Sequence, residues 1–130
     1  MIVLDASAAV DWLLQTSAGL RIEERIYAHR ETLHAPHLLD LEVTQVLRRL
    51  AQQGVVAGSR ADEAIHDLLD LRATRYPHFL LLPRIWQLRH NFSAYDAAYL
   101  ALAEQLRAPL ITRDARLASA SGRSITVELF

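Results

Sequence analysis

Short apolar runs alternate along the chain with longer segments in which apolar residues recur every three or four positions. A short apolar run bounded by turn residues is typical of a buried strand, whereas the longer period is typical of an amphipathic helix. The pattern predicts strands at residues 2–4, 33–35, 79–82, 109–112 and 125–129. It predicts helices at residues 6–14, 20–30, 37–53, 58–76, 83–88, 93–107 and 114–120.

This alternation predicts an α/β fold with a mainly parallel central sheet and helices on both of its faces. The 130 residues contain no linker or internal repeat, so we expect one domain spanning residues 1–130. The helices at 37–53 and 58–76 form a hairpin that either packs into the core or offers an apolar surface to a partner.

The amino-acid composition excludes several kinds of catalytic and binding site. The chain has no cysteine, which excludes disulfides, thiolate zinc sites and a thiol nucleophile, and we expect a reducing cytoplasm. No segment approaches the roughly 20 apolar residues of a membrane span, so we expect no membrane contact. All 14 basic residues are arginine, which excludes phosphate chemistry that depends on lysine. The net charge of −1 favours neither RNA nor DNA as a partner.

Four acids lie at positions that an ordinary, fully solvated carboxylate would not be expected to take. Asp5 directly follows the first strand and Asp114 lies two residues beyond the strand at 109–112, so both fall at the edge where parallel sheets bind ligands. Glu42 borders the apolar stripe of its helix, and Asp96 shares a helix face with apolar residues. The structural alternatives are N-caps at Asp5 and Asp114, a capping box between Ser93 and Asp96, and pairing of Glu42 with Arg48 or Arg49.

Converging carboxylates favour a divalent metal. Two of them about 4 Å apart repel by roughly 4 kcal/mol at an effective dielectric near 20, and a cation relieves this repulsion. With oxygen ligands and no zinc-type spacing among the six histidines, Mg²⁺ or Mn²⁺ is favoured over zinc. Ser7 and Thr112 either orient these ligands or are ordinary turn hydroxyls. The arginines near this edge, which either contact phosphates or are solvated, are Arg84, Arg89, Arg113 and Arg116.

Taken together, these residues resemble the PIN-domain ribonucleases, and more narrowly the VapC-type toxins of bacterial toxin–antitoxin pairs. The matching segments are residues 2–10 (IVLDASAAV), 35–49 (APHLLDLEVTQVLRR), 93–103 (SAYDAAYLALA) and 109–117 (PLITRDARL). They extend over nearly the whole chain. One departure is Gln45, since family members often have asparagine three residues after the acid that corresponds to Glu42.

The resemblance implies a three-layer α/β/α fold and cleavage of RNA by a Mg²⁺- or Mn²⁺-dependent endonuclease. It also implies a homodimer and inhibition by a cognate antitoxin that crosses helices near the active site. The acids that correspond to the family's metal site are Asp5, Glu42, Asp96 and Asp114, with Ser7 and Thr112 supporting them.

Three other functions compete with this one. A haloacid-dehalogenase-like phosphatase needs a second aspartate two residues after the first, where this chain has Ser7, and a receiver domain needs the missing lysine. The third is a catalytically silent PIN-like subunit that binds RNA or protein in a regulatory role. That role is usually accompanied by loss of a site carboxylate, whereas all four are present here.

Overall fold

The computed structural model of the chain describes residues 1–120 and 124–130. Within these ranges it contains five strands, seven α-helices and one 3-10 helix. The strands are β1 (Ile2–Leu4), β2 (Leu33–Pro36), β3 (Ala73–Tyr76), β4 (Leu110–Thr112) and β5 (Val127–Leu129). The helices are α1 (Ala6–Leu13), α2 (Ser17–Ala28), α3 (Leu38–Gln52), α4 (Gly58–Asp70), η1 (Phe79–Leu81), α5 (Leu82–Gln87), α6 (Ala94–Leu106) and α7 (Ala115–Ala118).

The strands form one sheet in the order β3-β2-β1-β4-β5, and every pair is parallel. In the pairing of β1 with β4, Val3 lies opposite Leu110 and Leu4 opposite Ile111. The chain leaves β1 toward β2 on one side and returns through β4 on the other, so the strand order reverses between β1 and β4. The expected parallel sheet is confirmed, and its reversal point lies beside Asp5.

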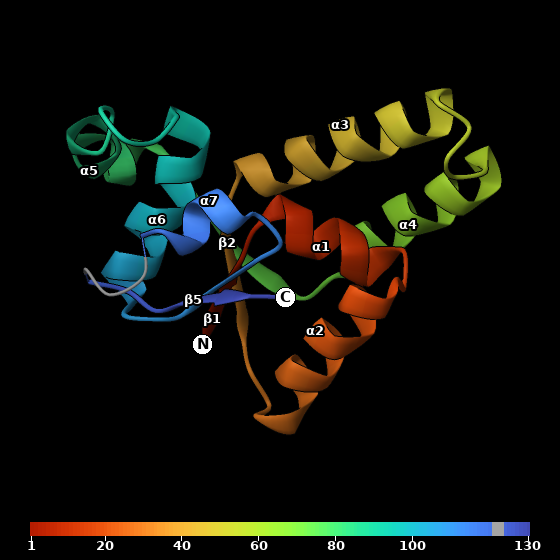
Figure 1. The fold of residues 1–130 in the computed structure, drawn as a ribbon, viewed down its shortest axis with the longest axis horizontal. Helices are drawn as coiled ribbons and strands as arrows, with labels where there is room; N and C mark the ends of the chain where they lie inside the picture. The colour runs from red at the N-terminus through yellow and green to blue at the C-terminus, as the bar shows by residue number, and fades with distance from the viewer. Residues whose placement is uncertain (121–123) are drawn as a thin grey trace.

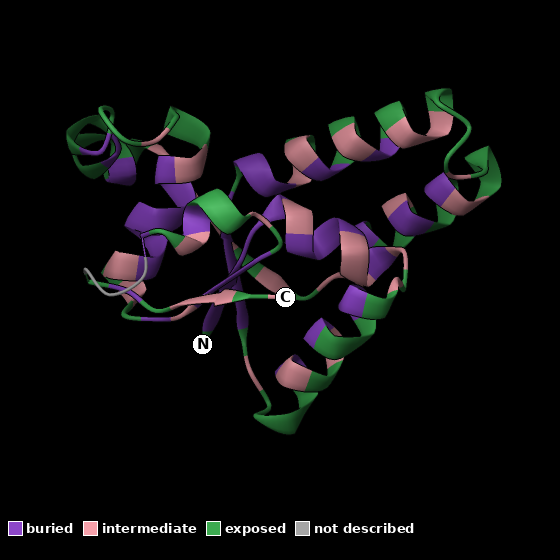
Figure 2. Ribbon diagram, in the orientation of Figure 1, coloured by how far each residue is buried: buried purple, intermediate pink, exposed green. Residues whose placement is uncertain are grey.

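Helices cover both faces of the sheet. Figure 1 shows α6 on one side of the strands with α5 outside it, and α1 and α2 on the other side. Helices α3 and α4 run antiparallel and project beyond the sheet as a hairpin. Figure 2 shows the buried residues concentrated in the strands and on the inner sides of α1 and α6, while exposed residues follow the outer sides of the hairpin. This is the three-layer α/β/α arrangement.

Local sequence explains where several helices begin. The Asp5, Thr16, Ser93 and Asp114 side chains each accept a hydrogen bond from a backbone N–H in the first turn of the helix that follows. Such caps satisfy N–H groups that have no partner inside the helix. Because Thr16 is a cap, α2 begins earlier than the expected residue 20.

In the described part of the chain, no helix combines the length and the apolar character that a membrane crossing requires.

The prediction of one continuous helix over residues 58–76 is wrong. Helix α4 ends at Asp70, and Ala73–Tyr76 form the edge strand β3, paired with β2 along its whole length. The strand was concealed because it is only partly buried and carries polar side chains. Its place depends on a distant contact: the Arg75 guanidinium donates to both carboxylate oxygens of Asp40, at 2.7 and 3.0 Å.

The prediction of a strand at residues 79–82 is also wrong. Phe79–Leu81 form a 3-10 turn and Leu82 begins α5. A short buried strand and an exposed apolar turn can have the same composition, so only the three-dimensional structure distinguishes one from the other. Phe79 and Leu80 are 77% and 75% exposed, so this apolar run lies on the surface.

The close approach of α1 and α2 requires Gly19. A Cβ atom at this position would lie 2.0 Å from the carbonyl oxygen of Asp11, so Gly19→Ala forces the two helices apart. We expect a loss of about 1–3 kcal/mol in the free energy of unfolding, measured by urea titration. Gly58→Ala is the matched control, because a Cβ there meets nothing within 4 Å and favours the helix. Equal losses for the two variants would contradict the explanation.

Candidate active site

Asp5 is held rigidly at the carboxyl end of β1. Its side chain is buried, and the residue is only 4% exposed. One carboxylate oxygen accepts hydrogen bonds from the Ala8 backbone N–H at 2.9 Å and the Ser7 hydroxyl at 2.7 Å. The other accepts a short hydrogen bond from the Thr112 hydroxyl. A carboxylate has about four lone-pair positions, so these three donors leave capacity for one more partner.

Ser7 and Thr112 also connect the two central strands. The Ser7 hydroxyl accepts from the Arg113 backbone N–H at 2.9 Å, and the Thr112 hydroxyl accepts from the Asp114 N–H at 2.9 Å. Both hydroxyls therefore donate to Asp5 and accept from the loop that follows β4. The expected orienting contacts of these hydroxyls with Asp5 are present.

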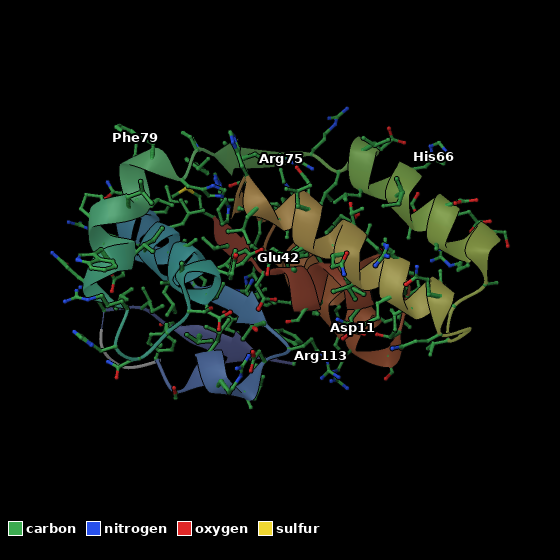
Figure 3. All side chains as sticks on the ribbon, turned by 90° about the horizontal axis from the view of Figure 1, so that it is seen from above. Asp11, Glu42, His66, Arg75, Phe79 and Arg113 are labelled. Atoms are coloured by element: carbon green, nitrogen blue, oxygen red, sulfur yellow. The ribbon has the colours of Figure 1, made fainter. Side chains whose placement is uncertain are left out.

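Glu42 reaches the same edge from α3. Figure 3 shows it among the side chains near the middle of the molecule. Its Oε1 atom accepts a 2.7 Å hydrogen bond from the Tyr99 hydroxyl of α6. This contact, rather than an ion pair with Arg48 or Arg49, holds Glu42 in place, so the alternative of a surface pair is wrong.

Asp96 and Asp114 both lie near the positively charged side chain of Arg116. The Arg116 guanidinium lies 2.7 Å from an Asp114 oxygen and 4.0 Å from an Asp96 oxygen. Asp114 caps α7 by accepting from the Arg116 backbone N–H at 2.9 Å. Ser93 caps the helix of Asp96 by accepting from the Asp96 N–H at 3.2 Å. The capping explanations for Asp5 and Asp114 are therefore correct, but they do not exclude a second role, because the capping carboxylates also line the cleft described next.

All four acids line one cleft of about 560 Å³ between α3, α6 and the ends of β1 and β4. Burial is the main reason why the pKa values of Asp5, Glu42 and Asp96 are raised. Mutual repulsion adds to this, since Asp5 and Asp96 both raise the pKa of Glu42. The hydrogen bond from Arg116 lowers the pKa of Asp114. The cleft thus concentrates carboxylates, and among the described residues Arg116 pairs with Asp114 and, at a longer distance, with Asp96.

The donor chemistry of this cleft fits a hard divalent cation. Every candidate ligand is a carboxylate oxygen, and Asp5 retains an unused lone pair. Across residues 1–120 and 124–130, no three acidic or histidine side chains already stand at metal-binding separation. Arg116 contacts Asp114 in this arrangement.

The four arginines expected near the phosphate have different environments. Arg84 donates to both carboxylate oxygens of Glu104, and Arg89 stacks on the Trp86 ring at 4.4 Å. Arg113 pairs with Asp11 at 2.7 Å, beside which it lies in Figure 3. Of these four, only Arg116 lines the cleft.

Tyr99 and Arg49 line the cleft with polar groups that were not predicted to belong to the site. Tyr99 counted only as an apolar neighbour of Asp96, although a buried tyrosine hydroxyl normally requires a partner and this one bonds Glu42. Arg49 lies seven residues after Glu42, on the same face of α3. That spacing was the available signal. None of the six histidines lines the cleft.

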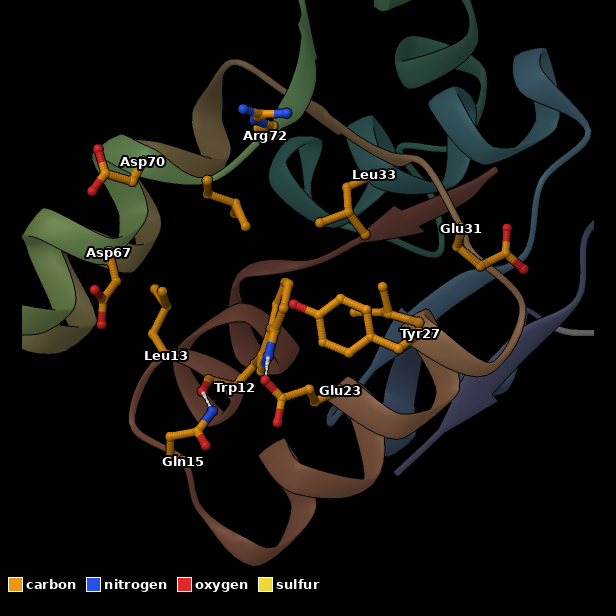
Figure 4. Close-up of a pocket in the computed structure, with 12 residues that line it drawn as sticks. Trp12, Leu13, Gln15, Glu23, Tyr27, Glu31, Leu33, Asp67, Asp70 and Arg72 are labelled. Atoms are coloured by element: carbon orange, nitrogen blue, oxygen red, sulfur yellow. Dashed lines mark hydrogen bonds between the residues drawn. The ribbon is translucent and has the colours of Figure 1, made fainter.

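A second hollow lies among α1, α2 and α4, near the amino end of β2 (Figure 4). Its floor includes Trp12, and acidic side chains surround it. The Trp12 indole N–H donates to Glu23 at 3.3 Å, and Glu31 pairs with the N-terminal amine and Arg25. Glu23 and Glu31 therefore already have partners. The hollow lies near the amino ends of the strands, whereas Asp5 lies at the carboxyl end of β1.

Comparison with known proteins agrees with this geometry. The PIN domain family matches residues 2–122. Ribonuclease VapC9 of Mycobacterium tuberculosis is 45% identical over 117 residues, covering 90% of this chain and 88% of the relative. Ribonuclease VapC12 of the same species is 40% identical over 129 residues, covering 99% and 98%. The chain belongs to the PIN-domain family, among the VapC ribonucleases.

Two solved VapC structures share the fold. The crystal structure of M. tuberculosis VapC20, a Sarcin-Ricin loop cleaving toxin, has a TM-score of 0.68 and 16% identity, and covers 93% of this chain and 95% of that one. VapBC2 from Rickettsia felis, crystallised with a DNA fragment from their promoter, has a TM-score of 0.72 and 13% identity, with 100% and 99% coverage. At these identities the likeness concerns the fold alone.

The repulsion within the cleft predicts that Glu42→Gln stabilises the protein in the presence of a chelator. Burial and neighbouring carboxylates raise the pKa of Glu42 in the folded protein, so its ionised form opposes folding at neutral pH. Glutamine removes the charge and still accepts the Tyr99 hydrogen bond. We expect a gain of about 0.5–1 kcal/mol at pH 7 that disappears as the pH falls below the unfolded value near 4.3.

Urea unfolding at several pH values measures this gain. Glu24→Gln, on the exposed side of α2, is the matched control and changes stability little. A Glu42→Gln variant that is less stable than the native protein at pH 7 would show that the carboxylates do not repel one another as described.

Proposed function

We propose that this VapC-family ribonuclease is the toxin of a toxin–antitoxin pair and hydrolyses RNA phosphodiester bonds with the aid of Mg²⁺ or Mn²⁺. The observation that carries the proposal is the cleft itself. It brings Asp5, Glu42, Asp96 and Asp114 together at the reversal point of a parallel sheet, three of them with raised pKa values. The names of the relatives support RNA as the substrate.

The four carboxylates are the groups that would hold the cation. When bound, a divalent cation offsets the charge of the phosphodiester and lowers the pKa of the water that attacks the phosphorus. Mg²⁺ and Mn²⁺ suit an all-oxygen site, and the cleft lacks the histidine and cysteine ligands that zinc prefers.

Each acid is positioned differently. Asp5 is fixed by three hydrogen bonds, so it presents its remaining lone pair in a constant direction. The Tyr99 hydroxyl orients Glu42 through Oε1 and leaves Oε2 unbonded within the described residues. Arg116 contacts Asp114 and lies near Asp96, so it stabilises the acids before a cation binds and is available to the phosphate afterwards.

The proposal extends to the partners. Exposed apolar side chains on the α3–α4 hairpin, Leu41, Val55 and Leu69, support an antitoxin-binding surface there. A chain with the same fold occurs in the solved structure of VapBC2 from Rickettsia felis. The exposed side chains of η1 and α5, including Phe79 and Trp86, support a homodimer, which light scattering of the purified protein tests. We propose that the 130 residues act in the cytoplasm as one domain.

A catalytically silent, RNA- or protein-binding subunit is the second candidate. The uncompensated charge on Asp5 and Glu42 argues against it, because repelling acids that serve no ligand reduce stability. It predicts RNA binding without cleavage.

Purified protein is expected to cleave RNA with Mg²⁺ or Mn²⁺ and to stop when chelator is added. Asp5→Asn and Asp96→Asn keep the size of each side chain but remove the charge that attracts the cation, so each lowers the cleavage rate by orders of magnitude. Asp62→Asn, on the exposed side of α4, is the control and retains full activity. Undiminished cleavage by Asp96→Asn would refute the proposed site.

Binding of the antitoxin is expected to slow amide hydrogen exchange within residues 39–71, because it covers the apolar side of the α3–α4 hairpin. Mass spectrometry of the free protein and the complex measures the change. Backbone amides of α2, which lie apart from this surface, serve as the internal reference. If protection appears only outside residues 39–71, the hairpin is not the antitoxin site.

A further inference from the structure

Another hollow, distinct from the one lined by Trp12, adjoins the acidic cleft and shares part of its wall. It has a volume of about 630 Å³, and the residues common to both are Glu42, Asp96 and Arg116. Glu42 and Asp96 therefore lie where the two parts of a longer groove meet, whereas Asp5 and Asp114 line only the acidic cleft. Arg49 lines only the acidic cleft and Tyr95 only the adjoining hollow, so these two residues lie on opposite sides of the acids.

The Arg49 side of the groove carries an uncommitted positive charge. Gln45, Val46 and Arg49 lie three, four and seven residues after Glu42 along α3, so the four residues form one stripe. Arg49 lies about 10 Å along the helix from Glu42. Within the described residues its guanidinium has no hydrogen bond or ion pair, unlike Arg116. It is therefore free to bind the phosphate of a neighbouring nucleotide.

The Tyr95 side carries an exposed aromatic ring. Tyr95 is 66% exposed although it lies next to Asp96 in the first turn of α6. Asn91 lines the same hollow, and its side-chain amide has no hydrogen bond in residues 1–120 and 124–130. An exposed ring beside a free amide suits a base removed from its stack, since the ring stacks on the base and the amide contacts the base edge.

We propose that this groove binds single-stranded RNA across the acidic centre, with a base stacked on Tyr95 on one side and a phosphate bound by Arg49 on the other. The proposal rests on the RNA-cleaving function above and adds two positioning residues, Tyr95 and Arg49. Double-stranded RNA does not fit it, because paired bases have no free face for Tyr95.

Binding of a fluorescein-labelled octauridylate in chelator, followed by anisotropy, tests the proposal without cleavage. Tyr95→Leu is expected to weaken binding roughly 5- to 150-fold, the usual effect of removing one stacking ring, while Tyr95→Phe restores it. Arg49→Gln is expected to reduce the slope of log affinity against log salt by about 0.7, the value for one phosphate contact to a single strand.

The chain offers a matched control for each change. Tyr27 is also 66% exposed but lies on α2, and Tyr27→Leu leaves binding unchanged. Arg48 is exposed on the same helix as Arg49 but does not line the cleft, and Arg48→Gln leaves the salt slope unchanged.

Octauridylates with one abasic nucleotide at successive positions identify the stacked base. At one position the abasic change weakens binding by native protein as much as Tyr95→Leu does, and it has no further effect in that variant. Native affinity in Tyr95→Leu, an unchanged salt slope in Arg49→Gln, or no binding of octauridylate by the native protein would each overturn the proposal. Weaker binding of the antitoxin alone would also overturn it and assign Tyr95 to that partner.

Failure of this inference is distinguishable from failure of the proposed function. If Mg²⁺-dependent cleavage is observed but both variants bind octauridylate normally, the function stands and the groove does not. If native protein binds octauridylate as described and cleaves no RNA with either cation, the groove stands and the nuclease does not.

Discussion

The parallel pairing of β1 with β4 is the contact on which the candidate site depends. The two strands lie side by side in register, and the Asp5 backbone N–H donates to the Ile111 carbonyl at 3.2 Å. As a result, the residues that follow each strand meet at one edge of the sheet. The Thr112 hydroxyl then lies between the Asp5 carboxylate and the Asp114 N–H, donating to one and accepting from the other. The register of the two strands thus determines where the side chains lie that follow each strand within two residues.

The same carboxylates serve folding and the proposed chemistry. Asp5 and Asp114 cap the helices that follow them, so each contributes local stability even before a ligand is considered. Glu42 makes no such contribution from its charge, because burial and like charges raise its pKa. Arg116 partly offsets the charge of the cluster from within the chain. The protein therefore tolerates several carboxylates close together, three of which have raised pKa values.

Two helices from opposite layers meet at this edge. Helix α3 contributes Glu42 and Arg49, while α6 contributes Asp96, Tyr95 and the Tyr99 hydroxyl that crosses to Glu42. That hydrogen bond links the hairpin to the helix covering the sheet. Each helix presents a stripe of residues one or two turns long, so α3 places Arg49 in the cleft and α6 places Tyr95 in the hollow that adjoins it.

The sequence by itself determined the fold class, the mainly parallel sheet and the identity of the four acids. Asp5 and Asp114 follow apolar strands directly, and such local patterns survive in any fold that places those strands side by side. Tertiary structure decided the rest. Ala73–Tyr76 became a strand through pairing with β2, and the apolar run at Phe79 remained exposed. The partner of Glu42 proved to be Tyr99, and Arg49 rather than Arg84, Arg89 or Arg113 lines the cleft. Periodicity reports which face of an element is apolar, but contacts between residues distant in sequence exist only after the elements pack.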